Sequence, residues 1–115
     1  MEGLVTSAAW LMHDVLAQVL EPPPPVDYLS WAEDNIVFES GPFPGPYNSV
    51  RFSYFNEVLR ALSPRDPCRI VTLSKSAQLG GTEVANIFTC GTLAMDPQLF
   101  LYAHPTEGNA IKWSK

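Results

Sequence analysis

The sequence has 115 residues, of which 46% are hydrophobic and 17% are charged, and its net charge is −5. This length allows one small domain, and the composition is too apolar for an intrinsically disordered chain. The negative charge excludes a surface that is basic throughout, which a general nucleic-acid binder would need, because affinity for phosphate backbones comes from lysine and arginine.

The charges are unevenly distributed along the chain. Residues 1–49 contain seven acidic residues and no lysine or arginine, whereas residues 50–115 contain seven basic and five acidic residues. An acidic leader therefore precedes a body with a net charge of +2. Neither part predicts a DNA-binding surface by itself.

Three features indicate a cytoplasmic protein with no membrane partner. Cys68 and Cys90 form no CxxC pair, so we expect two reduced, partly buried thiols and neither a metal site nor a disulfide. The first twenty residues are apolar, but they lack a basic n-region and contain His13 and Asp14, which argues against a signal peptide. No apolar run reaches transmembrane length.

The first half of the chain predicts helices separated by proline-rich segments. Apolar residues at helical spacing predict two amphipathic helices, one ending at Glu21 and one over Phe52–Leu62. Between them, Pro22–Pro25 predict an extended spacer, and Ser30–Glu33 (SWAE) fits a capping box at the start of a short helix. Ser40–Ser49 contains three prolines and two glycines and predicts an irregular loop.

The second half changes to an alternation of strands and helices. Arg69–Ser74 (RIVTLS) and Gln98–Ala103 (QLFLYA) predict buried strands, and Thr82–Leu93 between them predicts a helix. A further helix follows, with Thr106 as its expected cap, and His104 has no partner apparent in the sequence, so we assign it a structural role. This order predicts a βαβ unit, and hence an α/β fold with a parallel sheet and flanking helices.

The stretch KSAQLGGT, Lys75–Thr82, lies between the first predicted strand and its helix. A phosphate-binding loop, GxxxxGK[ST], needs glycines whose amides face the phosphates, a lysine for the phosphate charge and a Ser or Thr for Mg²⁺. Aligned on the pattern's last glycine, the sequence has Gly81 in place of the lysine and Lys75 at the first position. The alternative is a tight turn at Gly80 and Gly81 with Thr82 as a helix cap and Lys75 solvated, and spacing alone leaves both open.

Ordered sequence blocks extend the pattern over residues 26–115: YLSWAEDNIVF (Tyr28–Phe38), PGPYN (Pro44–Asn48), FSYFNEVLRAL (Phe52–Leu62), KSAQLGGTE (Lys75–Glu83), MDPQLFLYAHPTEGNA (Met95–Ala110) and the closing WSK. Together they resemble the large terminase subunit of tailed bacteriophages, in its lambda-type (GpA) branch, which packages DNA. In that family the phosphate loop is of a deviant type with its lysine at the front, which Lys75 fits.

The resemblance implies a P-loop NTPase fold that binds ATP and Mg²⁺. The loop residues would be Lys75, Ser76, Ala77, Gln78, Leu79, Gly80, Gly81 and Thr82. In it, Lys75 would contact phosphate, the two glycines would supply amides, Gln78 would orient the loop and Thr82 would ligate Mg²⁺. Tyr54 and Phe55 would stack the adenine, although helical spacing explains them equally well as core residues. Thr106 matches a motif that couples related motors to DNA, but it also fits a plain helix cap.

The resemblance also divides the chain and implies its partners. Residues 1–25 would be an amphipathic helix and a proline-rich linker, residues 26–68 a lead-in, and residues 69–115 a truncated P-loop core. In the full-length family the protein is an ATPase motor and an endonuclease, whose partners are double-stranded DNA, the small terminase subunit and the portal protein.

After the loop the acidic residues are Glu83, Asp96 and Glu107, and none lies at a strand end as a second acidic motif for hydrolysis requires. We therefore expect the first part of a longer protein, inactive by itself. In the family the strand with that motif separates the two strands predicted here, so their edges would be exposed. The alternatives are a non-enzymatic remnant that binds another terminase subunit through the leader and first helix, and an unrelated P-loop kinase.

Overall fold

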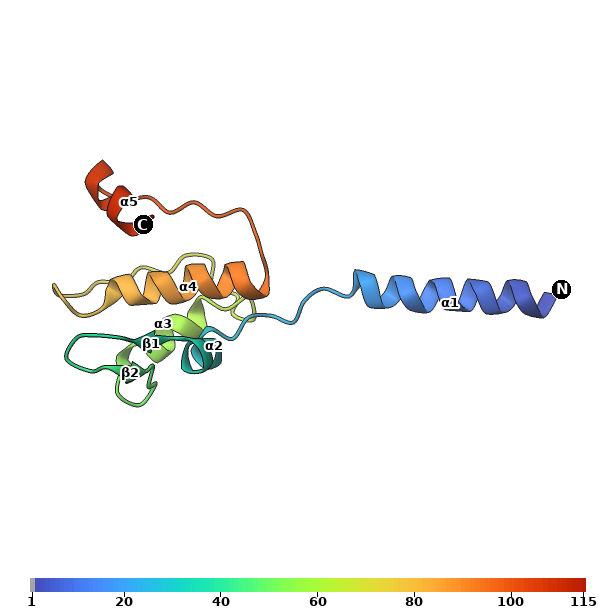
Figure 1. Ribbon diagram of the computed structural model, residues 1–115, viewed down its shortest axis with the longest axis horizontal. Helices are drawn as coiled ribbons and strands as arrows, with labels where there is room; N and C mark the ends of the chain where they lie inside the picture. The colour runs from blue at the N-terminus through green and yellow to red at the C-terminus, as the bar shows by residue number, and fades with distance from the viewer. Residues whose placement is uncertain (1) are drawn as a thin grey trace.

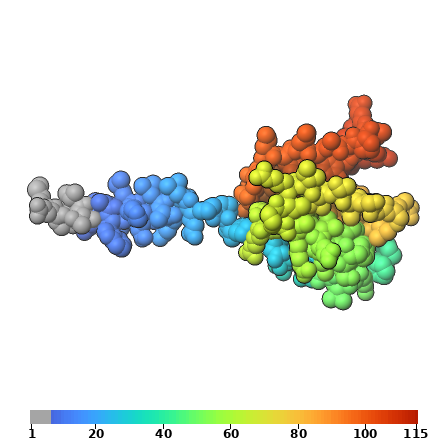
Figure 2. Space-filling model, turned by 180° about the vertical axis from the view of Figure 1, so that it is seen from behind, coloured from blue at the N-terminus to red at the C-terminus, as the bar shows by residue number. Residues whose placement is uncertain are grey.

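The structure is a computed structural model that describes residues 2–115, with side chains from residue 7 onward. Its elements in chain order are α1 (Glu2–Leu20), α2 (Tyr28–Asn35), β1 (Val37–Phe38), β2 (Gly45–Pro46), the 3₁₀ turn η1 (Ser53–Phe55), α3 (Asn56–Ala61), α4 (Gly81–Met95) and α5 (Glu107–Trp113). Figure 1 shows α1 projecting from a body formed by all the other elements. The molecule is therefore elongated, with extents of 71 × 33 × 29 Å, and Figure 2 shows it from behind.

The projecting helix α1 confirms the first predicted helix. It ends before Pro22–Pro25, which have no backbone N–H to continue a helix, and the chain then runs extended to the body. Its large apolar side chains from Trp10 to Leu20 are all exposed. Spanning a bilayer requires more length and apolarity than any of the described helices has.

Helix α2 begins three residues earlier than the capping-box pattern predicts. The carboxylate of Asp27 accepts hydrogen bonds from the amides of Leu29 (3.1 Å) and Ser30 (3.3 Å), so Asp27 is the N-cap. The prediction of a start at Ser30 is therefore wrong. Glu33 does not close the box either, because its Oε1 accepts a hydrogen bond from the amide of Ser49 (3.3 Å).

The proline-rich segment after α2 is more ordered than the sequence predicts. Within it, β2 pairs antiparallel with β1, in the register Val37↔Pro46 and Phe38↔Gly45. Gly45 has φ 116°, which only glycine adopts easily, and this conformation lets the chain turn back beside Phe38. The expected irregular loop is thus a short hairpin with a long connection, and this hairpin forms one wall of the site described below.

The core lies between α2, α3 and α4, and α2 packs against both of the other helices (Figure 1). Its members are buried apolar side chains: Val26, Tyr28, Ala32, Tyr47, Phe55, Leu59, Val84 and Ile87. Gly91 permits close packing of α2 on α4, because a Cβ there would lie 3.0 Å from the ring of Tyr28. The Tyr28 hydroxyl is 2.8 Å from Thr92 Oγ1, which itself donates to the carbonyl of Phe88 (2.7 Å). Tyr28 is therefore the donor, and this bond fixes α2 on α4.

The predicted parallel sheet is absent from the described residues, and the prediction of strands at Arg69–Ser74 and Gln98–Ala103 is wrong for this chain. Both segments are extended, but no backbone hydrogen bond joins either one to another described residue. Ile70 and Leu101 are 82% and 91% exposed, as expected for strand-like segments with no neighbour. A β-strand is defined by hydrogen bonds to a neighbouring strand. These two segments have the apolar composition of strands, but neither has a neighbouring strand among the described residues to pair with.

The predicted helices of the second half are confirmed as α4 and α5. Thr106 caps α5, and its Oγ1 accepts a hydrogen bond from the amide of Asn109 (3.3 Å). His104 packs on Tyr102, and its buried Nε2 has no hydrogen-bond partner among the described residues. The two cysteines are free, as predicted, but both are exposed and the expected partial burial is wrong.

Candidate functional site

The loop Lys75–Thr82 connects the first extended segment to the N-terminus of α4. Gln78 (φ 60°) and Gly80 (φ 80°) both adopt the left-handed conformation, and Gly80 is the residue that caps the helix. α4 then starts at Gly81, next to the predicted Thr82. The expected order of loop and helix is therefore confirmed, whereas the segment before the loop is extended and unpaired.

The first turn of α4 presents unpaired backbone donors. The amides of Glu83 and Val84 bond to the carbonyl of Gly80, at 2.9 and 3.4 Å. Within the described chain the amides of Gly81 and Thr82 donate no hydrogen bond. Free N–H groups at a helix N-terminus, together with the positive end of the helix dipole, favour an anion at this position.

The side chain of Lys75 folds back over this helix start. A Cβ built on Gly81 would collide with Lys75 Cε and would lie 2.6 Å from Cδ and 3.4 Å from Nζ. The ammonium donates a 3.4 Å hydrogen bond to the carbonyl of Ser76, and the side chain is exposed. The lysine from the front of the loop therefore lies where a side chain at position 81 would begin. Glycine at position 81 leaves room for it.

Thr82 is exposed on the first turn of α4, and its hydroxyl has no hydrogen-bond partner among the described residues. No group of three or more His, Cys, Asp or Glu side chains is arranged to hold a metal ion in the described part of the chain. A Mg²⁺ ion at this loop would therefore take the Thr82 hydroxyl together with oxygens of a bound phosphate, which is the way Mg²⁺ is usually held beside nucleotides.

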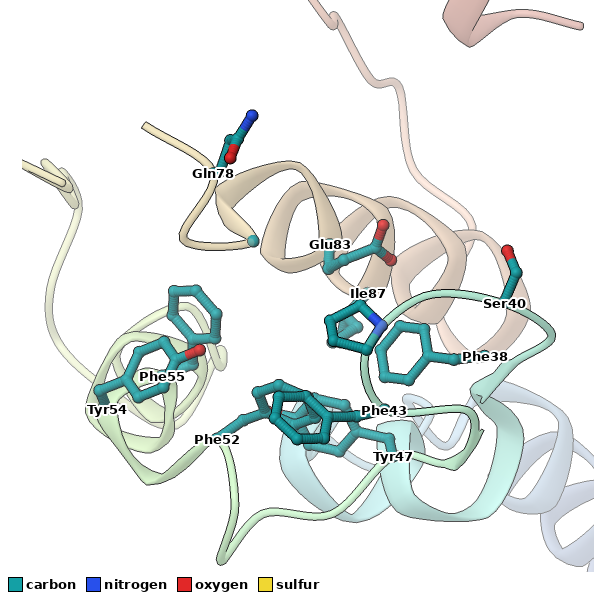
Figure 3. Close-up of a pocket in the computed structure, with 12 residues that line it drawn as sticks. Phe38, Ser40, Phe43, Tyr47, Phe52, Tyr54, Phe55, Gln78, Glu83 and Ile87 are labelled. Carbon is teal, nitrogen blue, oxygen red and sulfur yellow. The ribbon is translucent and has the colours of Figure 1, made fainter. Parts of the chain in front are cut away.

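An aromatic pocket of about 260 Å³ opens directly beside the loop (Figure 3). It is lined by the hairpin, by η1, by the loop and by α4: Phe38, Ser40, Pro42, Phe43, Tyr47, Phe52, Tyr54, Phe55, Gln78, Gly80, Glu83 and Ile87. The volume lies just below the roughly 300–1,000 Å³ of pockets for drug-sized ligands. It therefore suits one ring system, with the rest of a ligand continuing toward the loop.

Both members of the predicted aromatic pair line this pocket, and Phe55 also belongs to the core. Phe55 is 4% exposed, and the Cε2 atom of its ring would lie 3.4 Å from a Cβ on Gly80, so it supports the loop from below. Tyr54 is 51% exposed, and its ring lies 4.4 Å from that of Phe55. Gln78 lines the same pocket, although Figure 3 shows its side chain directed away from the aromatic rings.

Tyr47 carries a buried polar atom with no partner. Its side chain is 4% exposed, its ring stacks on Phe52 at 5.4 Å, and its hydroxyl has no hydrogen-bond partner among the described residues. Burial, then the neighbouring Tyr54 and Glu33, raise the pKa of the Tyr47 hydroxyl above its ordinary value of 10.0. The phenol is therefore protonated at neutral pH and able both to donate and to accept a hydrogen bond.

Most of the aromatic wall was not predicted from the sequence. Phe38, Phe43, Tyr47 and Phe52 contribute to it, and Arg51 closes over the ring of Phe43 at 4.7 Å. The sequence gives one sign of this wall, a local concentration of aromatic residues, because six of the ten Phe and Tyr residues fall within residues 38–55. Such a concentration of aromatic residues is also typical of an ordinary core, and only the fold shows that a cavity remains between these rings.

A family model supplies the decisive comparison. The model of the phage terminase large subunit gpA, ATPase domain, matches residues 41–115. The chain belongs to this family. The matched range contains Lys75–Thr82, α3, α4 and α5, so membership in the terminase family rests on the same residues that form the loop.

The assignment to the terminase family rests on the family model. No curated protein and no solved structure matches the chain. The family describes an ATPase domain, and the resemblance read from the sequence blocks is thereby confirmed at the level of the terminase large subunit. The hairpin Val37–Pro46 lies partly before the matched range, so β1 is placed beside the site by the fold and not by the match.

Proposed function

We propose that the chain forms the ATP-binding part of a phage DNA-packaging terminase. Lys75 and the amides of Gly81 and Thr82 bind the terminal phosphates, and the remaining residues of Lys75–Thr82 shape the loop. The Thr82 hydroxyl binds Mg²⁺, which neutralises phosphate charge. Tyr54 and Phe55 border the pocket that takes the adenine.

The single observation that carries this proposal is the position of Lys75. The strict phosphate loop has its lysine at the position of Gly81, and here the tail of Lys75 occupies the space directly beside that residue. Lys75 is also the only lysine or arginine between residues 70 and 111. An ammonium and two unpaired amides at one helix start form a binding site for a polyanion. A turn that only connects two segments needs neither of these features.

The pocket supports a nucleotide in preference to a bare phosphate. Six aromatic side chains line a cavity that borders Gly80 and Glu83 at the start of α4. Aromatic rings stack on the flat face of a base, and such stacking contributes roughly 1–3 kcal/mol per base. The proposed ligand thus extends from the aromatic rings to the loop, with its base in the pocket and its phosphates at α4.

The family provides the setting of this activity. The matched family is the ATPase domain of the phage terminase large subunit. We therefore propose that the activity serves DNA packaging, with double-stranded DNA, the small terminase subunit and the portal protein as the partners of the assembled motor.

The proposal is tested by unfolding the chain in urea with and without Mg-ATP. At about 100 times its dissociation constant, a ligand stabilises the folded state by roughly 2.7 kcal/mol. Hydrogen bonds to charged groups contribute about 1.5–3 kcal/mol, so Lys75→Ala is expected to weaken binding about 10- to 100-fold. The shift at the same ATP concentration then falls to about 0.4–1.4 kcal/mol.

The matched control for this experiment is Lys112→Ala. Lys112 is exposed in the last turn of α5 and lines none of the described pockets. The Lys112→Ala variant loses the same charge as Lys75→Ala and is expected to leave the ATP-dependent shift in unfolding free energy unchanged. An equal loss in both variants would mean that ATP responds to overall charge, and the assignment of the loop would be wrong.

A second candidate function is docking of another terminase subunit by α1. Seven large apolar side chains on this helix are exposed, including Leu11 (70%), Val15 (52%) and Val19 (73%). Leu11, Val15 and Val19 recur at helical spacing and form one stripe. Such a helix buries its stripe in a partner's apolar groove. Val15→Asp is expected to abolish capture of the purified small terminase subunit, whereas Ala17→Asp on the opposite side of the same helix leaves it intact. Equal capture by both variants would exclude the stripe as the contact.

A further inference from the structure

One wall of the aromatic pocket is only loosely attached to the rest of the protein. It is the connection between β1 and β2, residues 39–44, in which Ser40, Pro42 and Phe43 line the pocket. All of its residues are exposed, and its backbone forms no hydrogen bond with any described residue. Figure 3 shows this connection passing along one side of the pocket between Phe38 and Tyr47. Segments with few contacts and an exposed backbone open locally at a low cost in free energy.

Two glycines flank the part of the connection that contains Phe43. Gly41 has φ 110° and Gly45 has φ 116°, and nothing lies within 4 Å of a Cβ built on either of them. Neighbouring atoms therefore do not hold these two glycines in place, and glycine changes its backbone angles more easily than any other residue. Hinges are formed by a few loop residues that absorb such changes. Residues 42–44 can thus move as a unit between Gly41 and Gly45.

The side chain of Phe43 attaches the connection to the body of the protein. The guanidinium carbon of Arg51 lies 4.7 Å from the centre of the Phe43 ring, and this ring meets Phe52 edge-on at 6.3 Å. Arg51 belongs to a turn that is itself fixed, because its amide donates a hydrogen bond to Asn48 Oδ1 (3.1 Å). Phe43 is nevertheless 49% exposed. The contact of Arg51 with Phe43 thus joins a fixed turn to a weakly held segment.

We propose that residues 39–44 form a lid over the pocket, and that Arg51 keeps this lid closed through its contact with Phe43. This inference rests on the proposed function, because the ligand that the lid admits and releases is the nucleotide. Arg51 is a positioning residue, since it acts through Phe43 and does not itself line the described pocket.

The contact of Arg51 with Phe43 exists in the protein without ligand, so it stabilises the closed lid in the free and in the bound state alike. Removal of the contact increases the population of the open lid in both states. Ligand enters and leaves through the open lid, and its association and dissociation rates therefore rise by the same factor. The dissociation constant, which is the ratio of the two rates, stays unchanged.

The test measures the association and dissociation rates of Mg-ATP and Mg-triphosphate by surface plasmon resonance on the immobilised chain. Inorganic triphosphate binds Lys75 and the α4 amides without entering the aromatic pocket, so it reports the loop and any change in electrostatic attraction. The contact of a guanidinium with an aromatic ring shifts an opening equilibrium by about two- to fivefold. Arg51→Ala is therefore expected to raise both rates of Mg-ATP by about two- to fivefold relative to those of Mg-triphosphate.

Two further variants serve as controls. Arg51→Lys keeps a cation beside Phe43 and is expected to restore most of the wild-type rates. Arg60→Ala removes the same charge from an exposed residue in the last turn of α3, which does not line the aromatic pocket, and is expected to leave the ratio of the Mg-ATP rates to the Mg-triphosphate rates unchanged. Circular dichroism of each variant checks that the fold persists.

Each other outcome counts against a specific part of the account. If Arg51→Ala raises only the dissociation rate of Mg-ATP, Arg51 supports the bound ligand and residues 39–44 are not a lid. If neither rate changes, the inference is also wrong. If wild type binds Mg-ATP with the same rates as Mg-triphosphate, the pocket takes no base, and the lid is refuted while the loop stays a phosphate site. If wild type binds neither ligand, the proposed function fails together with the lid.

Discussion

Replacement of Gly81 by alanine separates the stability of the fold from the position of the lysine. The new Cβ would lie 2.6 Å from Lys75 Cδ, a separation that real Cβ atoms do not tolerate, so the lysine tail must move away from the helix start. The move costs the fold little, because Lys75 is exposed and makes only one 3.4 Å hydrogen bond. Gly81 is helical, and glycine is less favourable than alanine in a helix by roughly 0.5–1 kcal/mol.

The expected result is a free protein that is equally stable or more stable, by up to about 1 kcal/mol, and that binds Mg-ATP about tenfold more weakly. Urea denaturation without ligand gives the first quantity, and calorimetric titration gives the second. Gly108→Ala is the matched control, since nothing lies within 4 Å of a Cβ at that helical glycine. Unchanged ATP affinity in Gly81→Ala would refute the reasoning, because the lysine would then bind phosphate from another position or not at all.

Three further substitutions test the surroundings of the loop. Gly80→Ala is expected to destabilise the chain by about 1–2 kcal/mol in urea, because alanine is strained at φ 80°; no change would mean that this conformation is not maintained in solution. Tyr28→Phe removes the donor to Thr92 and is expected to cost about 1 kcal/mol by the same measurement, unless the bond is absent. Tyr47→Phe is expected to stabilise the free protein at neutral pH by removing an unpaired hydroxyl. Burial raises the pKa of Tyr47 in the folded state above 10.0, so above pH 10 the folded state holds a proton that the unfolded state loses. Wild type should therefore lose stability relative to Tyr47→Phe above pH 10, by up to about 1.4 kcal/mol per pH unit. Parallel pH profiles would contradict this.

The sequence predicts the local parts of this structure well. α4 follows from helical spacing after two glycines, and its start at Gly81 sets the amides of the loop. The cap of α5 by Thr106 follows from its hydroxyl, which supplies an acceptor three residues ahead of Asn109. At α2 the same reasoning chose the wrong residue, because Asp27 and Ser30 are both good caps and sequence alone does not rank two caps in one segment.

Features that depend on distant residues are not predictable in this way. The run Arg69–Ser74 has a strand composition, but a strand also needs a neighbouring ladder, which composition does not report. Likewise, the sequence assigns Tyr54 and Phe55 to the adenine or to the core, and the fold places one in the core and leaves the other half exposed. The position of Lys75 over Gly81 depends on the turn at Gln78 and Gly80, which has left-handed residues that spacing alone does not reveal.

The central claim is that a front-positioned lysine substitutes for the missing lysine at position 81, and moving the charge tests it most directly. The measurement is a calorimetric titration of Mg-ATP into the double variant Lys75→Ala/Gly81→Lys, compared with Lys75→Ala alone. The removal of Lys75 vacates the space beside Gly81, and the new side chain starts in that space. We predict that the double variant recovers most of the roughly 10- to 100-fold loss expected for Lys75→Ala. A double variant that binds Mg-ATP no better than Lys75→Ala would contradict the claim.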